Sequence, residues 1–174
     1  MNYKIIAVLL IALGAAARLF PHPANVAPIA AIALFGGMYL PKRYAVIAPL
    51  IALVASDFII GFYSWPILLT VYGSFVLTAL IGLWIRRRRT FTRVLGGAVF
   101  GSILFFLTTN AAVWAFGAMY PHTIGGLLES YTMAIPFFRN SLLGDLFYVG
   151  ILVGSMEFLL RRSQLQRVEH SRMN

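Results

Sequence analysis

Residues 67–116 read ILLTVYGSFVLTALIGLWI, RRRR, TFTR and VLGGAVFGSILFFLTTNAAVWAF in succession. Each long apolar run is free of charge and is about 20 residues long, the length that a helix needs to cross the hydrocarbon core of a bilayer. The block of arginines at 86–89 between the runs is typical of a cytoplasmic loop that faces anionic lipid. This stretch therefore predicts two transmembrane helices joined on the cytoplasmic side of a membrane.

The rest of the chain has the same apolar character. Of its 174 residues, 60% are hydrophobic and 11% are charged, and the mean hydropathy is +0.85. A soluble domain would need more charge to cover its surface, and nucleic-acid binding would need a compact basic domain, for which no room remains. We expect one all-α transmembrane domain over residues 1–160, a six-helix bundle in the lipid bilayer with spans at about 4–20, 29–40, 44–62, 67–85, 94–116 and 140–160.

The predicted connections differ in character. Residues 117–138 form the longest one and have room for a short interfacial helix, and residues 161–174 form a basic cytoplasmic tail. Residues 21–28 contain three prolines, which prevent a regular helix, and we expect this segment to cover the outer end of the bundle as an irregular lid. The first span could instead be a cleaved signal peptide, with alanines at 15–17 as the cleavage site. A retained helix is favoured because the apolar sequence continues into the second span.

The basic residues determine the predicted orientation. With both termini in the cytoplasm and six crossings, 12 of the 14 lysines and arginines fall inside, and only Arg18 and Arg139 fall outside, in agreement with the positive-inside rule. One span more or fewer after the arginine block would move a basic cluster outside. At the inner side, Glu157 is expected to meet an arginine of the tail or of the block at 86–89. The sequence thus predicts a multi-pass protein of the bacterial inner membrane with N-in, C-in topology.

Polar residues from several spans gather toward the outer side in this topology. Charged side chains are costly in hydrocarbon, so they pair with each other or line a wet cavity. We therefore predict an outward-facing pocket that binds a solute. The candidate contacts are Arg18, His22, Asn25, Asp57, Tyr63, Trp65, Asn110, Trp114, Arg139, Asn140 and Asp145.

Simpler roles stay open for several of these residues. Arg18 and Arg139 could extend to the outer lipid headgroups. They could also form structural ion pairs, Arg18 with Asp57 and Arg139 with Asp145. Asn110 could hold two helices together, and the tyrosines and tryptophans could form an interfacial aromatic belt.

No catalytic motif is found. The sequence has no HExxH, no GxSxG and no phosphate-binding GxxxxGK[ST] motif, so we expect no enzymatic activity, ATP hydrolysis included, and no cofactor. The absence of cysteine excludes thiolate metal sites. Two histidines far apart in sequence, His22 and His122, are a weak metal signal, and no metal site is predicted.

Two stretches carry a resemblance to known proteins: RLFPHPANVAPIAAIALFGG at residues 18–37 and ASDFIIG at residues 55–61. They resemble a family of small uncharacterised bacterial membrane proteins, which in turn is similar to the substrate-binding (S) components of energy-coupling-factor (ECF) vitamin transporters. The resemblance implies a six-helix S-component fold that binds a vitamin or related micronutrient in an outer pocket capped by the first loop. It also implies a membrane coupling subunit and ATPases as partners, with Ala12 and Ala16 as the matching docking residues.

The resemblance leaves the substrate open. A cobalamin-type substrate is conceivable, although a cysteine cobalt ligand is impossible in a chain without cysteine. Two further pairs of small residues, Gly97 with Gly101 and Gly150 with Gly154, could pack the bundle internally or dock another subunit.

Two other functions compete with solute binding. A membrane enzyme could act on a lipid-linked substrate at the outer leaflet, with Asp57 or Asp145 and His22 or His122 as acid and base. A structural or assembly protein could use its polar residues only to hold helices together. A closed, aromatic-lined outer cavity would favour binding, whereas a histidine within hydrogen-bond reach of an aspartate would favour an enzyme.

The charge distribution makes the topology testable with single cysteines, because the native chain has none. Cysteines placed beside Arg87 and in the tail at 161–174 should resist an impermeant thiol reagent added to intact cells, since both segments are expected in the cytoplasm. A cysteine replacing Glu129 in the outer connection is the control that should react. Labelling of either cytoplasmic position in intact cells would contradict the topology.

Overall fold

The structure is a computed structural model that describes residues 3–20, 26–62 and 64–173, with side chains as far as Leu165. These residues are all-helical apart from turns and connections. The helices are α1 (Tyr3–Ala17), α2 (Ile29–Tyr39), α3 (Lys42–Ala45), α4 (Ile47–Ile60), α5 (Trp65–Ile85), α6 (Phe91–Phe116) and α7 (Ile124–Met173).

Four helical segments are long and apolar enough to cross a membrane. They are Lys42–Ile60, which contains α3 and α4, then Trp65–Ile85, Phe91–Phe116 and Ile124–Leu165. The helices α1 and α2 are apolar but shorter. Four candidate spans in one chain indicate a multi-pass membrane protein.

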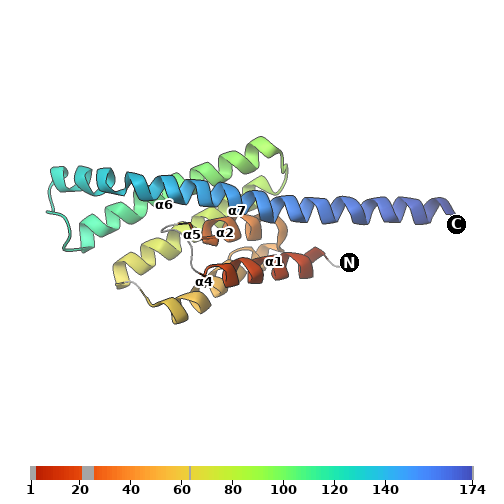
Figure 1. The fold of residues 1–174 in the computed structure, drawn as a ribbon, viewed down its shortest axis with the longest axis horizontal. Helices are drawn as coiled ribbons and strands as arrows, with labels where there is room; N and C mark the ends of the chain where they lie inside the picture. The colour runs from red at the N-terminus through yellow and green to blue at the C-terminus, as the bar shows by residue number, and fades with distance from the viewer. Residues whose placement is uncertain (1–2, 21–25, 63, 174) are drawn as a thin grey trace.

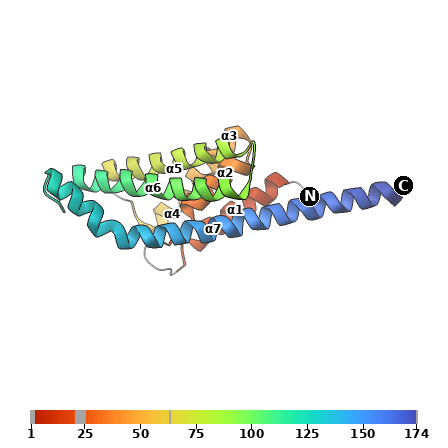
Figure 2. The ribbon, with the colours of Figure 1, turned by 90° about the horizontal axis from the view of Figure 1, so that it is seen from above.

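Helix α2 lies at the centre of the bundle. It contacts all of the other helices, most extensively α5 and α7, and every residue at 31–40 is buried. Figures 1 and 2 show it enclosed among the longer helices. The helix is short because Pro28 precedes it and Pro41 follows it, and proline at either end interrupts the helical hydrogen bonds. Its side chains are uncharged, so neighbours can pack on all sides.

The contact between α2 and α5 is made by backbone atoms. A Cβ atom on Gly37 would lie 2.2 Å from the carbonyl oxygen of Ala79, and a Cβ atom on Gly82 would lie 2.2 Å from that of Leu34. No side chain larger than hydrogen fits at either position without moving a helix. The two glycines therefore set the distance between α2 and α5, as small residues do at helix contacts in membranes.

The N-terminal end of α1 and the C-terminal end of α7 lie at the same end of the bundle, on the right in Figure 1. At this end Glu157 of α7 accepts a hydrogen bond of 2.5 Å from Tyr39 of α2, and its Oε1 lies 3.4 Å from Nε of Arg89. The Arg89 guanidinium also lies over the Tyr39 ring, 4.7 Å from its centroid. The prediction that Glu157 meets an arginine of the block at 86–89 is confirmed.

Helix α7 differs from the sequence prediction. Residues 117–138 were expected as a connection and residues 161–174 as a separate tail, but one helix of 50 residues runs from Ile124 to Met173. Pro136 lies inside it, and a proline removes only one backbone hydrogen bond, which the neighbouring turns tolerate here. The residues after 160 are mostly good helix formers such as arginine, glutamine and leucine. The helix therefore continues beyond the other helices, as both views show (Figures 1 and 2).

The pairs of small residues have different surroundings. Gly97 and Gly101 are buried, and Cβ atoms built on them meet side chains of α5, so this pair packs the bundle internally. Cβ atoms on Gly150 and Gly154 would meet nothing within 4 Å. Ala12 and Ala16, the predicted docking residues, are exposed.

The glycine contact can be tested with two matched alanine substitutions. Gly82→Ala should lower the melting temperature of the detergent-solubilised protein, because overpacking a tight contact costs about 1–3 kcal/mol. Gly96→Ala on α6 is the control, since a Cβ atom there has open space and alanine favours helix by about 1 kcal/mol. Tryptophan fluorescence would follow thermal unfolding. Equal melting temperatures for the two variants would contradict the backbone contact.

Candidate functional site

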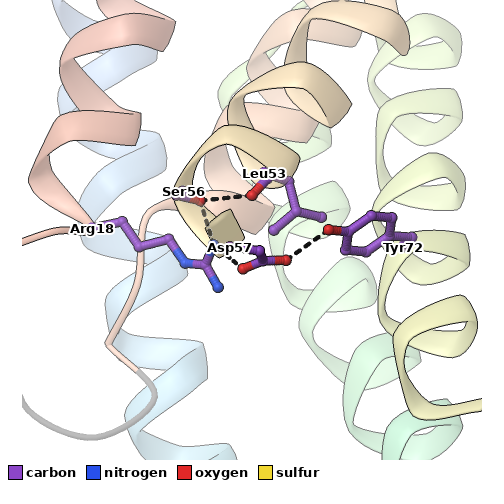
Figure 3. A network of polar contacts seen from close by, with 5 residues as sticks. All are labelled: Arg18, Leu53, Ser56, Asp57 and Tyr72. Carbon is purple, nitrogen blue, oxygen red and sulfur yellow. Dashed lines mark hydrogen bonds and ion pairs between the residues drawn. The ribbon is translucent and has the colours of Figure 1, made fainter. Parts of the chain in front are cut away.

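A charged network joins α1, α4 and α5. Nη1 of Arg18, directly after α1, lies 2.6 Å from Oδ1 of Asp57 on α4 and also donates to the Ser56 hydroxyl. The hydroxyl of Tyr72 on α5 donates to the other carboxylate oxygen of Asp57 over 2.7 Å. The Ser56 hydroxyl donates to the Leu53 carbonyl over 2.8 Å. Figure 3 shows the guanidinium and the phenol approaching the carboxylate from opposite sides.

The network compensates a fully buried carboxylate. Asp57 is 0% exposed, and an unpaired carboxylate at such a position would cost several kcal/mol. Arg18 reaches it because α1 and α4 pack side by side and because Arg18 directly follows α1 while Asp57 lies in the last turn of α4. The prediction that Asp57 has a partner is confirmed, and so is the ion pair with Arg18.

A first cavity of about 170 Å³ lies between α6 and α7. Its walls combine aromatic rings with hydroxyl and amide groups. Among the described residues of the predicted contact set, Asn110 alone lines this wall, and its amide donates to the Phe106 carbonyl of the same helix over 2.8 Å. The lining residues are Ser102, Phe105, Phe106, Thr109, Asn110, Ala134, Phe137, Phe138 and Ser141.

A second cavity of about 110 Å³ adjoins the first, because Phe105 and Ser141 line both. It contains two charged groups, Arg18 and Asp145, that the sequence predicted as candidate contacts. Asp145 is 5% exposed, and its Oδ2 accepts a hydrogen bond of 2.7 Å from the Ser102 hydroxyl. The lining residues are Arg18, Ala27, Ile29, Ala30, Val71, Phe75, Phe105, Ser141 and Asp145.

The other predicted contact residues either lie away from the two cavities or fall outside the residues that the structure describes. Trp65 is 69% exposed at the start of α5, and Asn140 is half-buried on α7. Trp114 donates from Nε1 to the carbonyls of Pro121 and Thr123, at 3.1 and 3.2 Å, and so holds the turn before α7. His22, Asn25 and Tyr63 lie outside the described residues, as does most of the predicted lid at 21–28.

The proposed ion pair between Arg139 and Asp145 was wrong. The two residues are six positions apart on α7, and at 3.6 residues per turn their side chains point about 120° apart around the helix axis. Side chains meet along a helix at spacings of three or four, not six. Arg139 is exposed, and within the described part of the chain it makes no ion pair with Asp145.

His122 and Asp145 lie far apart in the structure. His122 faces the Gly117 carbonyl at 3.3 Å and packs edge-on to Trp114. Asp145 is 21 residues beyond Ile124, the start of α7, or roughly 30 Å along the helix at 1.5 Å per residue. His122 therefore cannot share a proton with it. Among the described residues, no group of three or more histidine, aspartate or glutamate side chains could hold a metal ion.

Several residues that line the two cavities were not predicted from the sequence. Ser141 and Asp145 are four positions apart on α7, and Ser102 and Thr109 are seven apart on α6, so each pair shares one helix face. This periodicity of small polar residues was a usable signal. Tyr72 gave none, because a tyrosine in an apolar helix fits an interfacial position equally well.

Fold and site together define a multi-pass helical membrane protein with two adjoining cavities whose mostly apolar walls carry a few polar groups. The chain belongs to DUF6580, a family of unknown function whose pattern it matches over residues 1–168. No curated protein and no solved structure matches the chain.

The ion pair can be tested with a double-mutant cycle. Asp57→Asn and Arg18→Gln should each destabilise the protein by about 3–5 kcal/mol, because each leaves a buried charge without its partner. The double variant should lose clearly less than the sum of the two. Glu129→Gln on the exposed surface of α7 is the control, expected within about 0.5 kcal/mol of the wild type. Thermal unfolding in detergent gives the comparison, and additive losses would contradict a direct pair.

Proposed function

We propose that the protein is the membrane-embedded solute-binding component of a micronutrient uptake transporter. The observation that carries this proposal is the pair of adjoining cavities, which combine aromatic walls with a few convergent polar groups inside a helical bundle. Binding sites for small molecules have this composition. Polar groups kept inside a membrane bundle at a cost in free energy are expected to serve a solute pathway.

The proposed topology has six crossings with both termini in the cytoplasm. It is supported by the position of the cavities, which are lined by the first half of α5 and the second half of α6, for example Val71 and Asn110. These halves are far from the arginine block that follows α5. The basic end would then face the cytoplasm of the bacterial inner membrane, and the cavities would lie toward the outside. Helix α2 would cross as a short helix, tolerated because protein rather than lipid surrounds it.

The proposed solute is small. The cavities measure about 170 and 110 Å³, whereas drug-sized ligands occupy roughly 300–1,000 Å³. A compact micronutrient fits this space better than a cobalamin-type molecule, which would require the helices to separate widely.

The proposed partners are a membrane coupling subunit and its ATPases, as in ECF vitamin transporters. A groove of about 470 Å³ between α1 and α4 supports this part of the proposal. Ala12 and Ala16 line it together with Ala48, Ala52 and Ala55. Small side chains let a partner helix approach closely within a bilayer, and no residue of α6 or α7 is among those that line the groove.

The function is testable by native mass spectrometry of the purified protein. A small molecule should co-purify with the wild type, and Ser141→Phe should reduce its occupancy by roughly tenfold or more, equivalent to about 1.4 kcal/mol, because Ser141 lines both cavities. Leu143→Phe is the matched control, since Leu143 is 56% exposed on the same helix. Unchanged occupancy in Ser141→Phe, or no small molecule binding under any condition, would contradict the proposal.

A further inference from the structure

Asp145 is a buried carboxylate with no positively charged partner among the described residues. Ser102 donates to its Oδ2, and no described residue donates to its Oδ1. No buried side-chain oxygen or nitrogen in the described structure lacks a hydrogen-bond partner, so the unpaired Oδ1 is not sealed in the protein interior. Asp145 forms part of the wall of the second cavity.

Arg18 does not neutralise this carboxylate. It lines the same cavity, but its Nη1 is 2.6 Å from Asp57 and also bound to Ser56. The positive charge of Arg18 is therefore balanced by Asp57, which leaves Asp145 as the carboxyl group of this cavity without a counter-charge among the described residues. A carboxylate in such surroundings calls for a cation or a proton to compensate it.

The rest of the wall favours an organic cation over a metal ion. Phe75 and Phe105 stack with ring centroids 5.2 Å apart, and most other lining residues are apolar. A hard metal cation requires about six oxygen ligands, whereas the side chains here supply oxygens only from Ser141 and Asp145. An ammonium group needs one carboxylate, and aromatic faces stabilise its charge further.

We propose that the cavity lined by Phe75, Phe105, Ser141 and Asp145 binds the ammonium group of a small organic amine. The inference rests on the proposed function, and it specifies that the transported solute is cationic. The ammonium contacts Oδ1 of Asp145, and the apolar part of the amine lies against the two phenylalanine rings.

The first experiment measures thermal unfolding of the full-length protein in detergent with ethylammonium chloride. At about ten times its Kd, ethylammonium should raise the melting temperature by about 3–6 °C. Acetamide, acetate and sodium chloride at the same concentration should give no such rise. Asp145→Asn should abolish the response, and Glu129→Gln, which removes an exposed carboxylate from the same helix, should retain it.

A second experiment needs no variant, in case Asp145→Asn does not fold. Dicyclohexylcarbodiimide reacts with carboxyl groups in apolar surroundings, and mass spectrometry of peptides would follow its attachment to Asp145. Ethylammonium at about ten times its Kd should slow the total loss of free Asp145 carboxyl, counted as carbodiimide adduct plus ethylamide, by about tenfold, whereas acetamide should leave it unchanged. Labelling of Glu157, at the other end of the bundle, should be insensitive to both.

The outcomes separate this inference from the proposed function. A thermal shift with acetamide or acetate but not with ethylammonium would overturn the cationic solute and leave solute binding intact. A shift with ethylammonium that persists in Asp145→Asn, or labelling of Asp145 that ethylammonium does not slow, would also overturn the inference alone. If no solute of any charge binds and none co-purifies, both proposals fail.

Discussion

Helix α2 and helix α5 touch through backbone atoms at Gly37 and Gly82, and this contact determines how the other helices can be arranged. On its remaining sides, α2 is in contact with α1, α4, α6 and α7. An enclosed helix cannot carry a charged side chain unless that side chain has a partner, and α2 contains no charged residue. The charged residues Arg18 and Asp57 lie on or next to the surrounding helices α1 and α4, where they pair with each other.

The two buried aspartates are compensated in different ways. Asp57 has an arginine and a tyrosine on its two oxygens, so the protein itself supplies everything that its charge requires. Asp145 has only a serine on one oxygen. A protein that needed both carboxylates only for stability would gain by pairing Asp145 as well, or by replacing it with an apolar residue. The difference between the two aspartates is therefore more informative about function than the presence of either one.

Features that depend on the length, charge and depth of a helical segment could be predicted from the sequence. Features that depend on which way a side chain points around the helix axis could not. The helical hairpin around 86–89 follows from run length and charge, and Asp57 needs a partner because of its depth alone. The assignment of Arg139 to Asp145 failed because depth was considered without helical angle. The continuity of α7 through Pro136 depends on what the neighbouring helices allow, which the local sequence does not contain. The cavities depend on how side chains of α5, α6 and α7 fit together, and a pattern in one segment cannot give their volume.

Arg18 connects the candidate solute site with the groove proposed for a partner. It follows α1, forms part of the second cavity wall and pairs with Asp57 on α4. The groove that contains Ala12 and Ala16 lies between these same two helices. A partner that separated α1 from α4 would strain the ion pair at 2.6 Å and move Arg18 relative to the cavity. Because a buried pair costs several kcal/mol to break, separation of α1 from α4 would be opposed by the same side chain that lines the second cavity. That shared side chain offers a physical route by which docking at the groove could alter the binding of a solute.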